Sequence, residues 1–143
     1  MHIKTLTLAA ILALPATWVA AESHESGDAM EVAGDAEAGE KVFRKCMACH
    51  AVGEGARNKV GPALNGIVGQ DVAADGEFKY SDAMIEWGAD KQWTPETLAG
   101  FLENPRGTVK GTKMAFPGLR KEDERQNVIA YLATFESEEG EGS

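Results

Sequence analysis

Apolar residues recur at helical spacing at both ends of the central part of the chain. After Asp35, a typical N-cap residue, the pattern predicts a helix over Ala36–Cys49 with one apolar face. Gly39 lies inside this stretch, where glycine destabilises a helix relative to alanine, and it indicates a close crossing with another helix. A second long helix is predicted to begin near Lys121, with acidic residues in its first turn. Its apolar stripe consists of Val128, Ile129, Tyr131, Leu132 and Phe135.

Two shorter helices are predicted between these. Ser81 is a candidate N-cap for a helix that ends at Gly88. Thr94-Pro95 indicates another helix start, and that helix is expected to run to about Glu103 because Pro105 disfavours helical backbone before it. No stretch alternates between apolar and polar residues as a half-buried strand does. The sequence therefore predicts a small all-α domain.

Both ends of the chain differ in composition from its centre. Residues 1–21 combine a basic head, an apolar run too short to span a bilayer and small residues at the end, which predicts a signal peptide cleaved after Ala21. An uncleaved membrane anchor is the alternative. Residues 22–34 are predicted to be a disordered leader and residues 137–143 an acidic tail. The predicted domain covers residues 35–136.

The most specific chemistry lies in Cys46-Met47-Ala48-Cys49-His50. Its C-x-x-C-H spacing is that of a c-type haem attachment site, in which two cysteines form thioethers and the histidine binds the iron. A thiol redox pair, a zinc site and a structural disulfide are the alternatives. No βαβ pattern accompanies the two cysteines, a structural zinc usually needs four Cys or His ligands, and a disulfide would leave His50 unexplained. Because a domain of this length has a limited core, we expect the haem-free chain to be largely unfolded.

A second axial ligand is expected from a methionine, because the other two histidines lie outside the predicted domain. Met114 stands in a loop interrupted by glycine and proline that can fold over the far face of a haem. Met84 is the rival, although a methionine at helical spacing is usually a core residue. Ligation by histidine and methionine raises the reduction potential and fills both axial positions. This arrangement favours electron transfer over haem catalysis.

The chain resembles class I cytochromes c, a family that includes bacterial cytochrome c2 and mitochondrial cytochrome c. The resemblance covers nearly all of residues 35–135 and depends on the order and spacing of several motifs. These motifs are Cys46-x-x-Cys49-His50, Gly61-Pro62-Ala63-Leu64-x-Gly66, Phe78-Lys79-Tyr80-Ser81-Asp82-Ala83, Trp93, Leu102-Glu103-Asn104-Pro105 and Gly111-Thr112-Lys113-Met114-x-Phe116.

The resemblance implies a small cytochrome c fold, with helices wrapped around one covalently attached haem c. It implies that His50 and Met114 are the axial iron ligands and that the Pro62 carbonyl accepts the proton on the far nitrogen of His50. It also implies that Tyr80 and Trp93 donate hydrogen bonds to the haem propionates. The Thr112 hydroxyl would lie near the propionates and the axial methionine, and the Phe116 ring would shield the haem edge. Ordinary core packing is the alternative for the first two.

The formal net charge of −9 argues against binding to nucleic acid or to an anionic membrane. Basic residues nevertheless outnumber acidic ones in two stretches, residues 41–61 and 106–121. In the family, lysines around the exposed haem edge direct docking onto acidic patches of redox partners. The resemblance implies such a ring here, and a solvated basic face is the alternative. The candidate residues are Arg57, Lys59, Lys79, Lys110 and Lys113.

The expected function is that of a soluble, monomeric periplasmic electron carrier rather than an enzyme. It would take one electron from a cytochrome bc1-type complex and pass it to a terminal oxidase or a photosynthetic reaction centre through transient electrostatic docking. A haem peroxidase or gas sensor is an alternative that requires an open sixth position on the iron. A subunit of a larger periplasmic enzyme is another.

Overall fold

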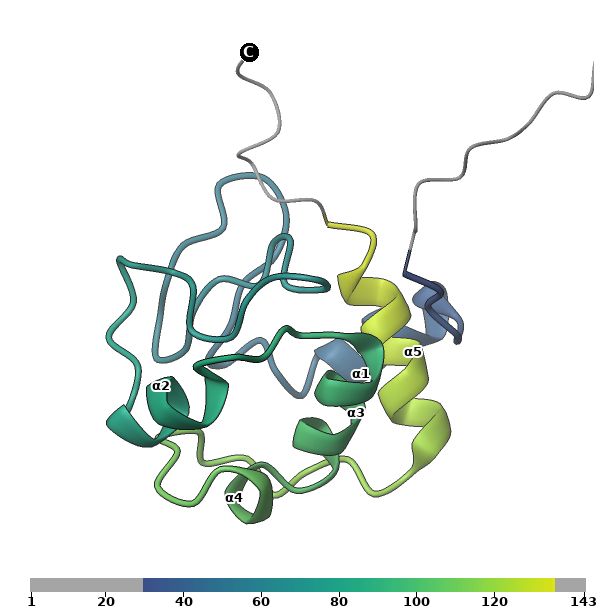
Figure 1. Ribbon diagram of the computed structural model, residues 1–143. Helices are drawn as coiled ribbons and strands as arrows, with labels where there is room; N and C mark the ends of the chain where they lie inside the picture. The colour runs from purple at the N-terminus through teal and green to yellow at the C-terminus, as the bar shows by residue number, and fades with distance from the viewer. Residues whose placement is uncertain (1–29, 136–143) are drawn as a thin grey trace, which may run out of the picture.

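The computed structural model describes residues 30–135. The predicted signal peptide, most of the predicted leader and the predicted acidic tail lie outside the described residues. Five helices follow one another along the described part of the chain (Figure 1). They are α1 (Ala36–Phe43), α2 (Asp82–Gly88), α3 (Pro95–Glu103), α4 (Pro105–Thr108) and α5 (Glu122–Leu132). Between residues 30 and 135 the β structure is limited to one isolated bridge, from Asp71 to Gln92, so the prediction of an all-α domain is confirmed.

Side-chain caps fix the starts of α1, α2 and α3 where the sequence predicted them. The Asp35 carboxylate accepts hydrogen bonds from the backbone N–H groups of Glu37 and Ala38. Ser81 and Thr94 cap α2 and α3 in the same way. α5 begins after Lys121 without a side-chain cap, and its first turn carries three acidic residues that complement the positive end of the helix dipole.

The first helix is shorter than predicted, because α1 ends at Phe43 rather than at Cys49. From there to Cys49 the chain continues in tight turns, in which backbone hydrogen bonds reach back three residues instead of four. Cys46 N donates to Phe43 O at 2.7 Å, and Cys49 N donates to Cys46 O at 3.0 Å. Such i→i+3 turns commonly end helices, and here they hold the two cysteines. The prediction that the cysteines lie on a regular helix was therefore wrong.

The short helix α4 was not predicted. The side chain of Asn104 accepts from Gly107 N at 3.0 Å, and Pro105 follows in the first helical position. Because Asn104 also terminates α3, one residue separates the two helices. The asparagine and the proline that end α3 thus start the next helix, which is a combination favoured at helix N-termini.

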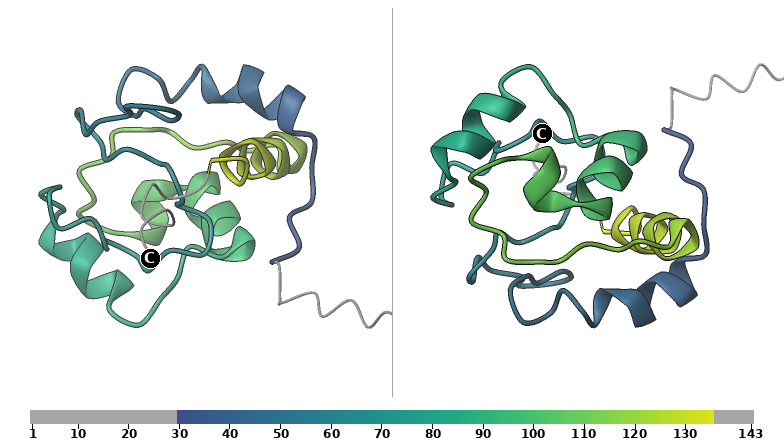
Figure 2. Two further views of the ribbon diagram at one scale, coloured as in Figure 1. Left: turned by 90° about the horizontal axis from the view of Figure 1, so that it is seen from above. Right: turned by 90° about the horizontal axis from the view of Figure 1, so that it is seen from below.

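The first and last helices pack directly against each other, as both Figure 1 and Figure 2 show. A side chain at Gly39 would collide with the backbone carbonyl of Asn127 in α5, so the predicted close crossing is confirmed. The Asn127 side chain also accepts from Asp35 N at 2.8 Å. One turn away, the rings of Phe43 and Tyr131 lie 5.4 Å apart.

The core combines side chains from the helices with others from the irregular segments that join them. These segments occupy a large part of the molecule in Figure 1, most of all between α1 and α2. No described helix has the length and apolar character that crossing a membrane would require. The buried apolar residues are Phe43, Ile67, Val72, Met84, Trp93, Leu98, Phe101, Leu102, Val109, Leu119, Val128, Ile129 and Leu132.

Candidate functional site

The attachment motif forms a compact turn directly after α1. His50 N donates to Cys46 O at 2.9 Å, and this bond brings the histidine back over the first cysteine. Cys46 and Cys49 are both free and half-buried, whereas Met47 between them is 54% exposed. The turn therefore presents both thiols partly to the interior and leaves the intervening methionine in solvent.

The thiol chemistry argues against a redox pair. Burial raises the pKa of Cys46 to about 11, although the positive charge of Lys45 opposes the increase. A redox-active cysteine needs the opposite shift, because the thiolate is the nucleophile. Cys46 stays protonated at neutral pH, as expected of a thiol that serves for attachment.

The imidazole of His50 is held in the orientation and the charge state that an iron ligand needs. Its Nδ1 lies 2.7 Å from the carbonyl oxygen of Pro62. Because a carbonyl can only accept, Nδ1 carries the proton and Nε2 keeps its lone pair. Burial lowers the pKa of His50, and the nearby charge of Lys59 lowers it further, against the effect of the Pro62 hydrogen bond. The ring is therefore neutral at physiological pH, with Nε2 bonded to none of the described residues.

Gly61 provides the space in which this ring lies. A Cβ at Gly61 would overlap three atoms of the His50 imidazole. Gly61 N also donates to Cys49 O at 2.9 Å, which ties the two segments together. We did not assign Gly61 a role from the sequence, and its position directly before Pro62 was the available signal.

Two polar side chains brace the segments around His50. Asn58 accepts from Ala63 N at 2.7 Å and donates to Asp75 at 2.7 Å, so it holds the loop that carries Pro62. The ammonium group of Lys59 donates to Met47 O at 2.6 Å. Sequence reasoning placed Lys59 only in the docking ring, and its contact with the attachment turn was not foreseen.

The segment that carries Met114 is extended, and its exposure alternates from one residue to the next. Residues 111, 113, 115 and 117 are exposed, whereas Thr112, Met114 and Phe116 are partly buried. Alternate residues of an extended chain point to the same side, so these three side chains face the interior together. Met114 and Phe116 pack against the hydrophobic core. Met84, the rival ligand, is 8% exposed and belongs to the core beneath α2.

Two further predicted haem contacts lie in or beside the aromatic part of the core. Trp93 is buried, and its ring lies 5.1 Å from that of Phe101 and 5.7 Å from that of Trp87. Its indole N–H has no hydrogen-bond acceptor among residues 30–135, and this nitrogen is not fully buried. Tyr80 is half-buried, and burial, with the charge of Asp75, raises its pKa. An acceptor on a cofactor would suit both groups.

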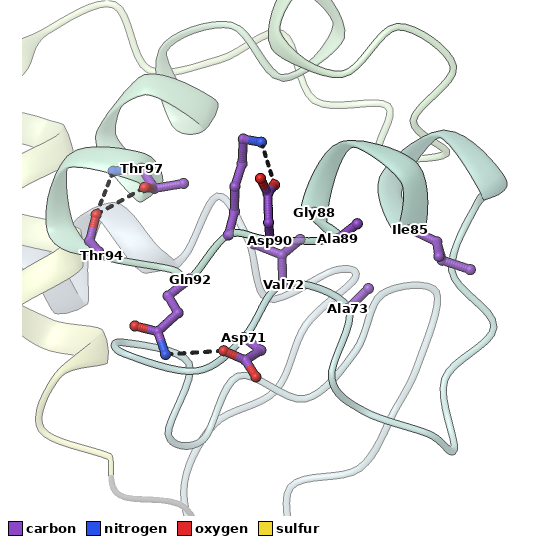
Figure 3. Close-up of a pocket in the computed structure, with 11 residues that line it drawn as sticks. Asp71, Val72, Ala73, Ile85, Gly88, Ala89, Asp90, Gln92, Thr94 and Thr97 are labelled. Carbon is purple, nitrogen blue, oxygen red and sulfur yellow. Dashed lines mark hydrogen bonds and ion pairs between the residues drawn. The ribbon is translucent and has the colours of Figure 1, made fainter.

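A separate hollow of about 790 Å³ lies between the loop at residues 71–73 and helices α2 and α3 (Figure 3). Its rim is polar, and its side chains bond to one another. The amide of Gln92 donates to Asp71 at 3.0 Å, and Lys91 contacts Asp90 at 3.1 Å. None of the predicted haem residues lines this hollow. The motif residues described above thus form a different site.

The donor atoms of the site match a covalently attached haem. Two free thiols three residues apart can form thioethers, and a neutral imidazole with a free Nε2 can bind iron from one side. A partly buried methionine on an extended segment offers a thioether sulfur. Gly61 leaves space for the imidazole, and Trp93 offers a donor without a protein partner. The residues present therefore fit the group that the motif predicts.

Comparison with known proteins gives a consistent result. The family model described as cytochrome c matches residues 36–136. The chain is 45% identical to cytochrome c-554 from Methylosinus trichosporium over 133 residues. The aligned residues make up 93% of this chain and 92% of the relative. It is 49% identical to cytochrome c2 from Agrobacterium tumefaciens (strain II Chrys) over 100 residues. These make up 69% of this chain and 90% of the relative. The solved structure of cytochrome c2 from Rhodospirillum Centenum has a TM-score of 0.68 and 40% sequence identity, with coverage of 73% of this chain and 100% of that one.

Proposed function

Because this chain belongs to the cytochrome c family, whose cofactor is a covalently attached haem c, we propose that it is a soluble periplasmic electron carrier. Electron transfer of the cytochrome c type follows from the family. The proposal adds the compartment, the partners and the residues at the site. When bound, the haem supplies a one-electron couple between ferrous and ferric iron.

In this proposal, Cys46 and Cys49 hold the haem through thioethers, and His50 and Met114 are the axial ligands. The observation that supports the assignment of Met114 is the alternating exposure of residues 111–118, in which the side chain of Met114 packs against the core. A site with two protein ligands has no open position for oxygen or peroxide. Electron transfer then needs only a rigid site and an accessible edge.

The other side chains of the site orient and shield the cofactor. Pro62 fixes the His50 ring through the 2.7 Å contact, which also increases the basicity of the ligand nitrogen. Tyr80 and Trp93 donate to the propionates, and the Thr112 hydroxyl lies near them. Thr112 Oγ1 also accepts from Met114 N at 3.2 Å, which links this hydroxyl to the ligand segment. Phe116 covers the haem edge.

The proposed docking face is basic, although the chain as a whole is acidic. All five residues of the proposed ring are exposed. Two of the ammonium groups are also fixed by backbone carbonyls: Lys59 by Met47 O at 2.6 Å, and Lys113 by Lys79 O at 3.3 Å. These contacts place positive charge beside both proposed ligand segments. A face of this kind attracts the acidic patches of partner proteins.

The proposed donor is a cytochrome bc1-type complex, and the acceptor is a terminal oxidase or a photosynthetic reaction centre. The rate at which a purified bc1-type complex reduces the ferric protein should fall as salt is added, because the Debye length is about 10 Å at 0.1 M and about 3 Å at 1 M. A rate that rises steadily with salt would contradict a basic docking face. Mixing the ferrous protein with oxidase-containing membranes or with reaction centres would identify the acceptor.

The compartment is tested independently by cell fractionation and N-terminal sequencing. The proposal predicts recovery in the periplasmic fraction, with Glu22 as the first residue. Recovery in the membrane fraction with residues 1–21 still attached would support an uncleaved anchor instead. Gel filtration of native extract should show a free monomer rather than a subunit of a larger enzyme.

A further inference from the structure

Arg125, in the first half of α5, contacts the end of the segment that carries Met114. Its guanidinium Nη1 donates to Leu119 O at 2.8 Å and to Arg120 O at 3.0 Å. Both acceptors lie directly after the extended stretch that turns Met114 inward. A hydrogen bond from a charged donor is shorter and stronger than a neutral one. One side chain thus holds two consecutive carbonyls at the point where the segment rejoins the fold.

The Met114 segment is fixed at its two ends and only partly buried between them. At one end Val109 is 2% exposed, and its N–H donates to Pro105 O at 2.9 Å. At the other end Leu119 is 3% exposed, and its N–H donates to Leu102 O at 2.7 Å. Residues 110–118 include no buried side chain. Between these anchors Met114 and Phe116 pack against the core and Lys113 bonds to Lys79 O. The anchors add to these contacts, and Arg125 secures the second anchor.

The guanidinium group of Arg125 is only partly satisfied by hydrogen bonds. Its Nε is buried and has no hydrogen-bond partner in residues 30–135. Burial of an unpaired polar atom destabilises a fold, so the other contacts of the guanidinium must offset this penalty. The neighbouring Glu124 contacts Lys45 at 2.8 Å, but that pair is partly exposed and contributes little. Arg125 and Glu124 thus each attach this turn of α5 to another segment.

We propose that Arg125 is a positioning residue that keeps the Met114 segment closed over the haem. It acts through the carbonyls of Leu119 and Arg120, so it controls how readily an external ligand displaces the methionine from the iron. The inference rests on the proposed ligation by Met114. It adds a determinant that lies in α5, outside the segment itself.

Imidazole binding to the ferric holoprotein tests this directly, because imidazole can bind only when the segment opens. Arg125→Ala should raise the apparent affinity for imidazole about ten-fold, which corresponds to about 1.4 kcal/mol in the opening equilibrium. Arg125→Lys should give a smaller increase, since one ammonium group can replace only part of the two-carbonyl contact. The conservative variant also provides a result if the alanine variant does not fold.

Two matched controls separate positioning from charge and from general stability. Arg120→Ala removes the same charge from an exposed residue just after the segment, and Val128→Ala weakens the buried packing of α5. Neither should change the imidazole affinity by more than about two-fold. The inference is overturned if Arg125→Ala matches Arg120→Ala, or if Val128→Ala raises the affinity as much as Arg125→Ala does.

The spectrum of the unmutated protein distinguishes this failure from failure of the proposed ligation. Ferric haem bonded to methionine sulfur has a weak absorption band in the red. If the unmutated protein lacks that band and binds imidazole without competition, the Met114 assignment itself is wrong and the inference falls with it. If the band is present and Arg125 has no effect, only the inference fails.

Discussion

His50 depends on two neighbours, Gly61 and Pro62, that act on its ring through their backbone. Pro62 offers a carbonyl to Nδ1, and Gly61 leaves room for the ring. Glycine has no Cβ, so this dipeptide can approach the imidazole closely and bring the Pro62 carbonyl to the Nδ1 proton. The orientation of the proposed iron ligand is therefore set by backbone atoms.

Replacing Gly61 with alanine should destabilise the holoprotein by about 1–3 kcal/mol, because the new Cβ would overlap the pinned His50 ring. Urea denaturation of the purified holoprotein measures the change. Gly76→Ala is the matched control, since a Cβ there meets no atom within 4 Å. Equal stability of the two variants would show that Gly61 does not shape the histidine pocket.

Both tyrosines of the chain should titrate late in the folded protein. Burial raises the pKa of Tyr80 and of Tyr131 above 10.0, and the charges of Asp75 and Glu40, respectively, raise it further. The folded state then keeps protons that the unfolded chain loses, so the free energy of unfolding should decrease as pH rises past 10. Titration of tyrosinate absorbance measures this. A folded-state midpoint at or below 10.0 for either residue would contradict the prediction.

The sequence motifs predicted the pairing of His50 with Pro62, but they did not predict the contacts that Gly61 and Lys59 make beside it. The bond between His50 and Pro62 has the geometry that the family resemblance implied. The roles of Tyr80, Trp93, Thr112 and Phe116 toward the haem stay predictions. The contacts of Arg125 could not be read from the sequence, because they join a side chain to carbonyls whose positions depend on how a loop folds.

At the scale of the elements, the crossing of α1 and α5 organises the domain. Gly39 allows the two backbones to approach, and the rings of Phe43 and Tyr131 pack against each other beside the crossing. Helix starts were predictable because they depend on local caps such as Asp35 and Ser81. The end of α1 was not, since the change from i−4 to i−3 hydrogen bonds has no clear signal in the sequence.

Alanine substitution should have opposite effects at two helical glycines. Gly39→Ala should lower the free energy of unfolding by about 1–3 kcal/mol, because its Cβ would overlap the Asn127 carbonyl. Gly100→Ala in α3 should raise it by about 0.4–1 kcal/mol, because the site is open and alanine restricts the unfolded chain. Urea denaturation of both variants measures the difference. The same sign for both would contradict the account of the α1–α5 crossing.

At the scale of the whole molecule, long-range contacts through irregular segments complete the fold. Gly66 N donates to Phe135 O at 2.7 Å, and Gly69 N donates to Trp93 O at 2.9 Å. Such pairings connect residues far apart in the sequence, which is why periodicity and capping predicted four of the five described helices but not the path of the chain between α1 and α2. A buried cofactor would add apolar contacts to a core of limited size.

The haem-free chain should therefore be largely unfolded. A Cys46→Ala/Cys49→Ala variant purified without haem should show little helical circular dichroism and no cooperative thermal transition, whereas the holoprotein should show both. The physical reason is that the core alone does not offset the chain entropy lost on folding. A native-like cooperative melt of the haem-free variant would show that the polypeptide folds on its own.

The most direct test of the central claim is the absorption spectrum of the exported protein in the ferric state. The account predicts the spectrum of a haem that stays with the polypeptide, with the red band of methionine-bonded iron. That band should persist in Met84→Ala and disappear in Met114→Ala. A spectrum without haem, a spectrum of iron with an open face at neutral pH, or loss of the band in Met84→Ala would contradict the account.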